Sequence, residues 1–329
     1  MTDALLRVED LGVTIGGAPV VDGVSFAMRK GEVLALVGES GCGKSLTALA
    51  LLRLLPPAAR LAGGRVLLDG TDLAALPDRA MRRLRGQALS IIFQEPTASL
   101  DPLTTVGSQV MEAWRAHNAG GAAQARRAAR DMLDAVGIPD AEKRLDQYPF
   151  ELSGGMCQRI MIAIALICGP SLLVADEPTT ALDVTIQAQI LDLMRRLVAE
   201  RGAGVLIITH DMGVVADIAD RVAVMYAGRI VEVAPVTDLF AAPRHPYTAM
   251  LLASVPRLDV VPKAVLATIE GSVPAPEAFG SGCRFAGRCP LAVARCTAET
   301  PPLNEVAPGR LAACWRSAEA STLLSGAAA

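Results

Sequence analysis

Short apolar runs alternate with longer amphipathic stretches over much of the chain. Three of the runs, EVLALV, SLLVAD and GVLIITH, carry few charges, which is typical of strands buried inside a sheet. Stretches with helical spacing follow these runs, over residues 46–55, 184–202 and 212–220. Because strands that alternate with helices form parallel sheets with right-handed crossovers, we predict an α/β fold.

Other patterns interrupt this alternation. Residues 5–37 have the pattern of short strands separated by glycine-rich turns. This pattern predicts a small antiparallel sheet that leads into a core strand. Helical spacing without strands runs from about residue 97 to residue 168, so we expect a helical subdomain inserted between core strands. From about residue 255 periodicity fades, and proline, cysteine, arginine and glycine increase. We therefore predict two domains, residues 1–254 and a small cysteine-rich tail of residues 255–329.

The sequence GESGCGKS, from Gly38 to Ser45, lies between the first buried strand and the helix after it. It matches G-x-x-x-x-G-K-[ST] in the strand, loop and helix context that a phosphate-binding loop requires, which predicts a P-loop NTPase core. Glycines let such a loop curl, so that successive N–H groups point at phosphate oxygens. We expect Lys44 to reach the β- and γ-phosphates and Ser45 to bind Mg²⁺. The predicted nucleotide contacts here are Gly38, Ser40, Gly41, Cys42, Gly43, Lys44, Ser45 and Leu46.

Composition and charge argue against a membrane-spanning, secreted or nucleic-acid-binding protein. The 329 residues are 52% hydrophobic with a mean hydropathy of +0.38, yet the longest unbroken apolar run, Ile160–Cys168, has about half the length of a membrane span. The first ten residues carry charges where a signal peptide has its apolar core, so we expect a cytosolic protein. The net charge of −3 and the scattered basic residues provide no basic stripe for nucleic acid.

A second glycine-containing motif, LSGGMCQR at residues 152–159, opens a helix. Ser153 is well placed as the N-cap of this helix. Gly154 and Gly155 expose N–H groups that can hold a phosphate. We assign Ser153, these two glycines and Gln158 to the predicted nucleotide contacts.

Polar side chains at the ends of the predicted strands are candidates for catalysis. Asp176 and Glu177 end the run LLVADE, at the sheet edge where ligands bind in such folds. Asp176 is placed to hold Mg²⁺, and Glu177 to act as a general base on the attacking water. Gln94 and His210 end two other strands, and the sequence ALD, residues 181–183, follows Glu177 closely.

In this order the motifs resemble those of the ATP-binding cassette (ABC) ATPase family, over about residues 5–250. The resemblance implies a head-to-tail dimer with two ATP molecules at its interface, each held by the phosphate loop of one subunit and the LSGG of the other. It implies that Gln94 binds Mg²⁺ and the attacking water and senses a membrane subunit. It also implies that His210 contacts the γ-phosphate and that Asp183 communicates across the dimer. The sequence contains no N-K-x-D motif of a GTPase and no H-R-D or D-F-G motif of a protein kinase.

One position departs from the family pattern. The family usually stacks adenine on an aromatic residue about where Ile15 stands, and isoleucine offers only apolar contact. Base–aromatic stacking is worth on the order of 1–3 kcal/mol, so we expect weaker nucleotide affinity or base selectivity here.

Two further sequences resemble the ATPase subunits of oligopeptide and dipeptide importers. FQEPTASLDPL extends the loop at Gln94, and APRHPYTAML, residues 242–251, resembles the C-terminal segment that these subunits share. Physically, His245-Pro246-Tyr247 is also compatible with an ordinary helix start.

The tail carries four of the seven cysteines, Cys283, Cys289, Cys296 and Cys314. In a cytosolic chain they indicate a metal or free thiols rather than disulfides. Four thiolates suffice for a [4Fe–4S] cluster or a Zn²⁺ ion, and the spacings of five, six and seventeen residues lack the close C-x-x-C pairs that zinc favours. A subset of peptide-importer ATPases resembles this tail and carries [4Fe–4S], so we favour the cluster over zinc and over unligated thiols.

The other cysteines belong to the ATPase region. Cys42 lies in the phosphate loop, where a helix N-terminus favours a thiolate, and it can alternatively be a small filler at a permissive position. Cys157 and Cys168 are expected to pack in the helix that LSGG opens.

The sequence thus predicts the ATP-hydrolysing subunit of an ABC importer for dipeptides or oligopeptides, at the cytoplasmic face of the inner membrane. The expected partners are a second ABC ATPase, either a copy or a related paralogue, two membrane permeases and an extracytoplasmic binding protein, without nucleic acid. The alternatives are import of nickel, antimicrobial peptides or sugars, and a soluble ABC ATPase that acts on ribosomes or DNA.

Overall fold

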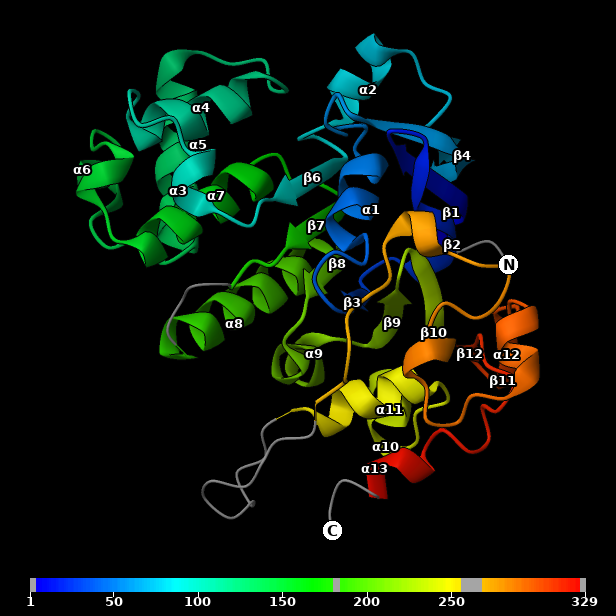
Figure 1. Cartoon of the computed structure of the whole chain (residues 1–329). Coiled ribbons are helices and arrows are strands. Elements are labelled where there is room, and N and C mark those ends of the chain that lie inside the picture. Colours follow the sequence, from blue (N-terminus) through cyan, green and yellow to red (C-terminus); the bar gives the residue numbers. More distant parts are fainter. Residues whose placement is uncertain (1–3, 180–183, 256–267, 326–329) are drawn as a thin grey trace. The chain divides into compact units, whose positions relative to one another are not determined.

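The structure is a computed structural model that describes residues 4–179, 184–255 and 268–325 (Figure 1). Its contacts divide the chain into two compact units, and the chain passes between them several times. The described residues of the first unit fall in the ranges 4–6, 28–32 and 67–208. Those of the second unit fall in the ranges 7–27, 33–66 and 209–325.

The stretch without strands in the first unit is helical, as its spacing predicted. Its elements are α3 (Pro96–Ser99), α4 (Val106–Arg115), α5 (Ala122–Ala135), α6 (Ala141–Arg144), η1 (Pro149–Glu151) and α7 (Gly154–Leu166). The helices α4, α5 and α7 pack against one another (Figure 1). Fully buried side chains such as Val110, Leu133 and Ile162 provide the apolar contacts between them.

Three parallel strands of the first unit carry the predicted strand-end residues. They are β6 (Leu89–Ile92), β7 (Leu172–Asp176) and β8 (Gly204–Thr209), in the order β8-β7-β6. The strand β7 is buried along its whole length, as expected for a parallel sheet covered on both faces. The same unit contains α2 (Asp78–Leu84), β5 (Thr71–Asp72) and α8 (Val184–Arg201), which connects β7 to β8.

The second unit contains the strand that precedes the phosphate loop. This strand, β3 (Val33–Val37), pairs in parallel with β9 (Arg221–Tyr226), which forms an antiparallel hairpin with β10 (Arg229–Pro235). The helices of this region are α1 (Lys44–Leu51), α9 (Met212–Ile218), α10 (Val236–Ala241) and α11 (Pro246–Ala253). The predicted antiparallel sheet is present, with β2 (Ala18–Arg29), β1 (Ala4–Ile15) and β4 (Ala59–Leu68) side by side in that order.

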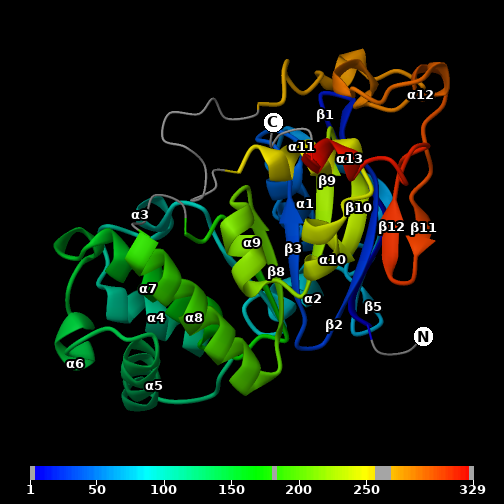
Figure 2. The ribbon, with the colours of Figure 1, turned by 90° about the horizontal axis from the view of Figure 1, so that it is seen from below.

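The tail joins the second unit through two strands that periodicity did not reveal. Its elements are η2 (Pro276–Ala278), η3 (Ala286–Arg288), α12 (Ala294–Ala298), β11 (Asn304–Ala307), β12 (Arg310–Ala312) and α13 (Thr322–Ser325). The strand β12 pairs antiparallel with β10, with Glu232 opposite Ala312, and β11 pairs with β12 (Figure 2). Strands of three and four residues are too short to show an alternating pattern. The predicted division into residues 1–254 and 255–329 stays a prediction.

Within the described residues, no helix is both long enough and apolar enough to cross a membrane.

Candidate functional site

The phosphate loop has the strand, loop and helix arrangement that its sequence predicted. It leaves β3 at Val37 and enters α1 at Lys44, with Gly43 as N-cap. The ammonium group of Lys44 is buried in the loop, where its Nζ donates hydrogen bonds to the carbonyl oxygens of Gly38 (2.8 Å) and Glu39 (3.0 Å). The loop therefore wraps around this cation.

Neighbouring backbone explains two glycines of the loop. A Cβ atom at Gly38 would lie 2.1 Å from the carbonyl oxygen of Met225 on β9. At Gly43, with φ of +104°, a Cβ would lie 3.0 Å from the carbonyl oxygen of Val20 on β2. The other predicted contacts lie in the same loop and first helical turn, where Ser40, Gly41 and Ser45 are exposed and Leu46 is half-buried. Their contacts with nucleotide stay predictions.

The thiol of Cys42 does not fit the thiolate interpretation. The side chain is 1% exposed, and burial raises the pKa of this thiol, despite the nearby Lys44. The carbonyl oxygen of Cys42 accepts a hydrogen bond from the N–H of Gly228, in the turn between β9 and β10. Of the two interpretations of Cys42, its burial favours the small packed side chain over the thiolate.

The first unit brings two of the predicted catalytic residues into contact. Gln94 follows β6 and Glu177 follows β7, and these adjacent strands run in parallel. Nε2 of Gln94 donates a hydrogen bond to Oε2 of Glu177 at 3.0 Å. Glu177 has a φ of +48°, a conformation that non-glycine residues rarely adopt, and its N–H donates to the carbonyl oxygen of Ile208. Asp176, the last residue of β7, is 7% exposed.

The helix α7 begins as its sequence predicted. Oγ of Ser153 accepts a hydrogen bond from the N–H of Met156, so Ser153 is the N-cap, and Gly154 and Gly155 form the first turn. Gln158 is buried, and its Nε2 donates to the carbonyl oxygen of Pro178. This hydrogen bond joins α7 to the loop after Glu177. The predicted contact of Gln158 with nucleotide stays a prediction.

Of the three remaining predicted residues, the structure describes Ile15 and His210. Ile15 is the last residue of β1 and is 37% exposed. His210 follows β8 and is exposed. Asp183 lies outside the described residues. Their roles stay predictions.

The four tail cysteines line one narrow cavity, together with His245, Phe285 and Trp315. Burial raises the pKa of the Cys283, Cys289 and Cys314 thiols, that of Cys314 to about 11. Among the described residues, no three His, Cys, Asp or Glu side chains are grouped tightly enough to hold one metal ion. The four cysteines thus line the same cavity, and their binding of a metal stays a prediction.

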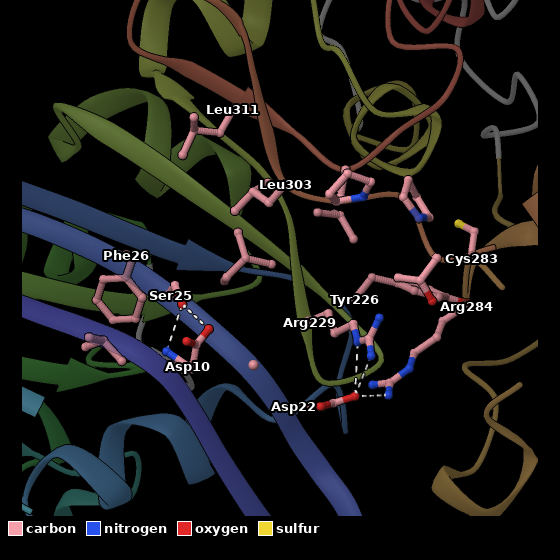
Figure 3. A pocket seen from close by; sticks show the side chains of 18 of the residues that line it. Asp10, Asp22, Ser25, Phe26, Tyr226, Arg229, Cys283, Arg284, Leu303 and Leu311 are labelled. Atoms are coloured by element: carbon pink, nitrogen blue, oxygen red, sulfur yellow. Dashed lines mark hydrogen bonds and ion pairs between the residues drawn. The ribbon is translucent and has the colours of Figure 1, made fainter. Parts of the chain in front are cut away.

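A larger cavity of about 730 Å³ lies between β1, β2, β10 and the tail (Figure 3). Asp22 of β2 is bonded there to Arg229 of β10 (2.8 Å) and to Arg284 of the tail. Arg284 also donates to the carbonyl oxygen of Ala227 at 2.6 Å, in the turn whose Gly228 is bonded to Cys42. Sequence reasoning missed Asp22 and Arg284, because no motif contains them.

Comparison with known proteins identifies the family. The family described as "ABC transporter" matches residues 21–180, and that described as "Oligopeptide/dipeptide transporter, C-terminal region" matches residues 231–296. A probable peptide ABC transporter ATP-binding protein of Sinorhizobium fredii is 52% identical over 326 residues, covering 98% of this chain and 97% of that protein. The dipeptide transport ATP-binding protein of Bacillus subtilis is 48% identical over 318 residues, covering 95% of each.

Solved structures agree with this relationship. A dimeric ATP-binding cassette in a post-hydrolysis state, bound to ADP and Pi, matches with a TM-score of 0.63 at 25% identity, covering 70% of this chain and 98% of that one. The extended identity to transporter ATP-binding proteins includes the tail as well as the phosphate loop. The chain therefore belongs to the ABC transporter ATPases, in the group that carries the oligopeptide/dipeptide transporter C-terminal region.

Proposed function

We propose that this chain is the ATP-hydrolysing subunit of an ABC importer for dipeptides or oligopeptides. Two relatives similar over nearly their whole length are described as peptide and dipeptide transport proteins. The C-terminal region that gives the peptide family its description is matched at residues 231–296. Both similarities support a peptide as the transported solute.

The hydrogen bond between Gln94 and Glu177 is the observation that carries the proposed reaction. A general base must be held within hydrogen-bonding reach of the water that it activates. The Gln94 amide orients the Glu177 carboxylate, and the backbone of Glu177 is held by Ile208. Glu177 would accept the proton of the attacking water, while the phosphate loop and Lys44 hold the triphosphate.

Oxygen atoms of Ser45, Gln94 and Asp176 are the predicted ligands of Mg²⁺. Hydroxyl, amide and carboxylate oxygens are the donors that this hard cation prefers. Mg²⁺ would neutralise charge on the β- and γ-phosphates. Asp176 and Glu177 are neighbours in the chain, and the proposal gives them separate roles. Asp176 would bind the metal, and Glu177 would accept the proton of the attacking water.

The proposed active form is a head-to-tail dimer of cassettes. The chain contains one phosphate loop and one LSGG sequence, and a cassette of similar fold is described as dimeric. The second cassette would be a copy or a related paralogue. Two permeases would hold the dimer at the cytoplasmic face of the inner membrane, and an extracytoplasmic binding protein would deliver the peptide.

The variant Glu177→Gln tests the proposed reaction. It keeps the size of the side chain and removes the base, so ATP hydrolysis should fall by about 10²–10⁴-fold. Binding of ATP should remain, because the phosphate loop is unchanged. Steady-state hydrolysis and nucleotide titration of the complex with its permeases measure both quantities. A rate near that of the wild type would reject Glu177 as the base.

We also propose that the four tail cysteines hold a [4Fe–4S] cluster. The four side chains line one cavity. Four thiolates form the ligand set of such a cluster.

Anaerobic purification followed by iron, sulfide and zinc analysis tests this assignment. We expect about four iron and four sulfide per chain and a brown chromophore, as four Cys ligands imply. Cys289→Ser should lose both, whereas Cys168→Ser, which changes a thiol outside the tail, should keep them. Zinc at one per chain, or no metal at all, would overturn the proposal.

A further inference from the structure

Glu39, the second residue of the phosphate loop, is bonded both to Lys44 and to the C-terminal region. Its carbonyl oxygen accepts a hydrogen bond from Nζ of Lys44 at 3.0 Å. Its N–H donates to Oη of Tyr247 at 2.8 Å, and its carboxylate accepts from Nη1 of Arg288 at 2.9 Å. Any movement of Tyr247 or Arg288 therefore displaces a carbonyl group on which the Lys44 ammonium rests.

Tyr247 is held rigidly for this contact. It is fully buried near the start of α11, and its ring packs against Tyr226 and Phe285 with centroids 4.7 and 5.4 Å away. Burial raises the pKa of its hydroxyl, so the group stays neutral. The helix start is itself fixed, because Nδ1 of His245 accepts a hydrogen bond from the N–H of Tyr247.

Arg288 connects the phosphate loop to the cysteine segment. Besides Glu39, its guanidinium bonds Oη of Tyr226 at 3.2 Å and the carbonyl oxygens of residues 269–271 at 2.8 to 3.4 Å. All five of its N–H groups are thereby used. The side chain is 9% exposed, so its charge-assisted bond to Glu39 is largely shielded from water. Arg288 immediately precedes Cys289 in the chain.

A second arginine of the same segment, Arg284, bonds a turn that is itself hydrogen-bonded to the phosphate loop. Arg284 follows Cys283, and Figure 3 shows its guanidinium beside Asp22. Its bond to the carbonyl oxygen of Ala227 holds the turn whose Gly228 N–H donates to Cys42 at 2.9 Å. The segment of residues 283–289 thus holds the phosphate loop at two of its residues, Glu39 and Cys42.

We propose that Tyr247 and Arg288 are positioning residues for the phosphate loop, so that the C-terminal region is part of the support of the ATP site. This inference rests on the proposed function in one respect, that ATP binds at residues 38–45. A displaced Glu39 moves the Lys44 ammonium away from the position at which it meets the phosphates. The expected effect is on nucleotide binding, because both residues bond Glu39 of the phosphate loop.

Two variants test the proposal in the full-length chain. Tyr247→Phe removes the acceptor of the Glu39 N–H and keeps the packed ring, and we expect the Kd for MgATP to rise about three- to tenfold. Arg288→Met removes a charge-assisted bond and should raise Kd at least about tenfold. The KM for ATP should rise in parallel, and kcat should stay within about threefold. Titration with a fluorescent ATP analogue and steady-state hydrolysis give these values.

The chain offers a matched control for Arg288→Met. Arg295 precedes Cys296 as Arg288 precedes Cys289, and it bonds Glu299 and stacks on Trp315 instead. Arg295→Met should keep Kd within about twofold of the wild type. The double variant Glu39→Gln with Arg288→Met should raise Kd no more than the larger single effect, because both remove the same bond.

Each outcome decides the proposal. Tyr247→Phe with the wild-type Kd would overturn it, even if the melting temperature falls, because that result describes a structural residue only. If Arg288→Met does not fold, Tyr247→Phe and Glu39→Gln decide in its place. Lys44→Ala distinguishes failure of the proposed ATP site from failure of the positioning role. If its Kd is unchanged, ATP does not bind at this loop and the proposed site fails; if only Lys44→Ala weakens binding, the positioning role fails alone.

Discussion

At the scale of single residues, the site depends on backbone conformations that few residues tolerate. Glu177 adopts a φ of +48°, and such strain costs about 1–3 kcal/mol and is retained where the surrounding structure enforces it. Its N–H is held by Ile208 on the neighbouring strand, which provides that enforcement. Gly38 has no alternative, since a Cβ would collide with the Met225 carbonyl group. The chemistry of the site therefore begins with local geometry.

Ile15 supports a prediction at this scale. It ends β1 and its side chain is 37% exposed, so an aromatic ring can be placed there without entering the core. Ile15→Tyr should tighten ATP binding about fivefold or more, since base–aromatic stacking is worth about 1–3 kcal/mol. Isothermal titration calorimetry measures the change, with Ile15→Leu as the control that should leave affinity unaltered. Unchanged affinity in Ile15→Tyr would show that this position does not contact the base.

At the scale of elements, neighbouring strands and turns hold the loops in place. Gln94 meets Glu177 because β6 and β7 are adjacent and parallel, so that the residues after them leave the same edge of the sheet. The turn between β9 and β10 holds Cys42 through the N–H of Gly228. A Cβ atom at Gly228 would lie 2.5 Å from the carbonyl oxygen of Val20, so glycine is required there. These hydrogen bonds tie the loops to the strands and turns beside them.

The ion pairs of Asp22 give a prediction for these contacts. Burial raises the pKa of Asp22, but hydrogen bonds and charges from Arg229 and Arg284 lower it by more. The pKa of Asp22 is therefore below its ordinary value of 3.8. Asp22→Asn should reduce the free energy of unfolding by about 1–3 kcal/mol at pH 7, as expected for hydrogen bonds to a charged group. Urea denaturation at several pH values measures the difference.

The sign of the pH dependence follows from the lowered pKa. A carboxylate that is more acidic in the folded state stabilises it above the unfolded pKa, and this contribution is lost as the pH falls through the folded value. The gap between wild type and Asp22→Asn should therefore be full above pH 3.8 and close below it. Asp10→Asn, at an exposed residue bonded to Ser25, should change stability by less than about 0.5 kcal/mol. A gap that persists in acid would contradict the role of the carboxylate charge.

At the scale of the molecule, the chain returns from its C-terminal end to support a loop near its beginning. The strand β12 covers the edge of β10, and Phe285 packs between Tyr226 and Tyr247. Residues more than two hundred positions apart, Glu39 with Tyr247 and Arg288, meet at the phosphate loop. The tail is therefore bound to other parts of the second unit by strand pairing, by aromatic packing and by these side-chain bonds.

Truncation after Val255 tests this integration. Loss of the tail exposes the hydrogen-bonding edge of β10 and two buried tyrosines, so the shortened chain should melt several degrees lower and should self-associate. Its Kd for MgATP should rise at least about tenfold, because Arg288 is absent. Thermal unfolding, size-exclusion chromatography and nucleotide titration measure these effects. A monodisperse, fully stable fragment with wild-type affinity would show that the tail is independent.

The amino-acid sequence determined the local motifs, because their chemistry depends on residues that are close in the chain. GESGCGKS, the N-cap Ser153 and the ends of β6 and β7 could all be predicted from pattern and spacing. The sequence left two interpretations of Cys42 open, and packing by distant residues favours the small buried side chain, since burial raises the pKa of its thiol. Likewise, only the tertiary structure brought Asp22 to Arg284 and Glu39 to Arg288, and paired β12 with β10. These contacts join parts of the chain that no short motif contains, and side-chain burial and strand pairing are decided only when those parts pack together.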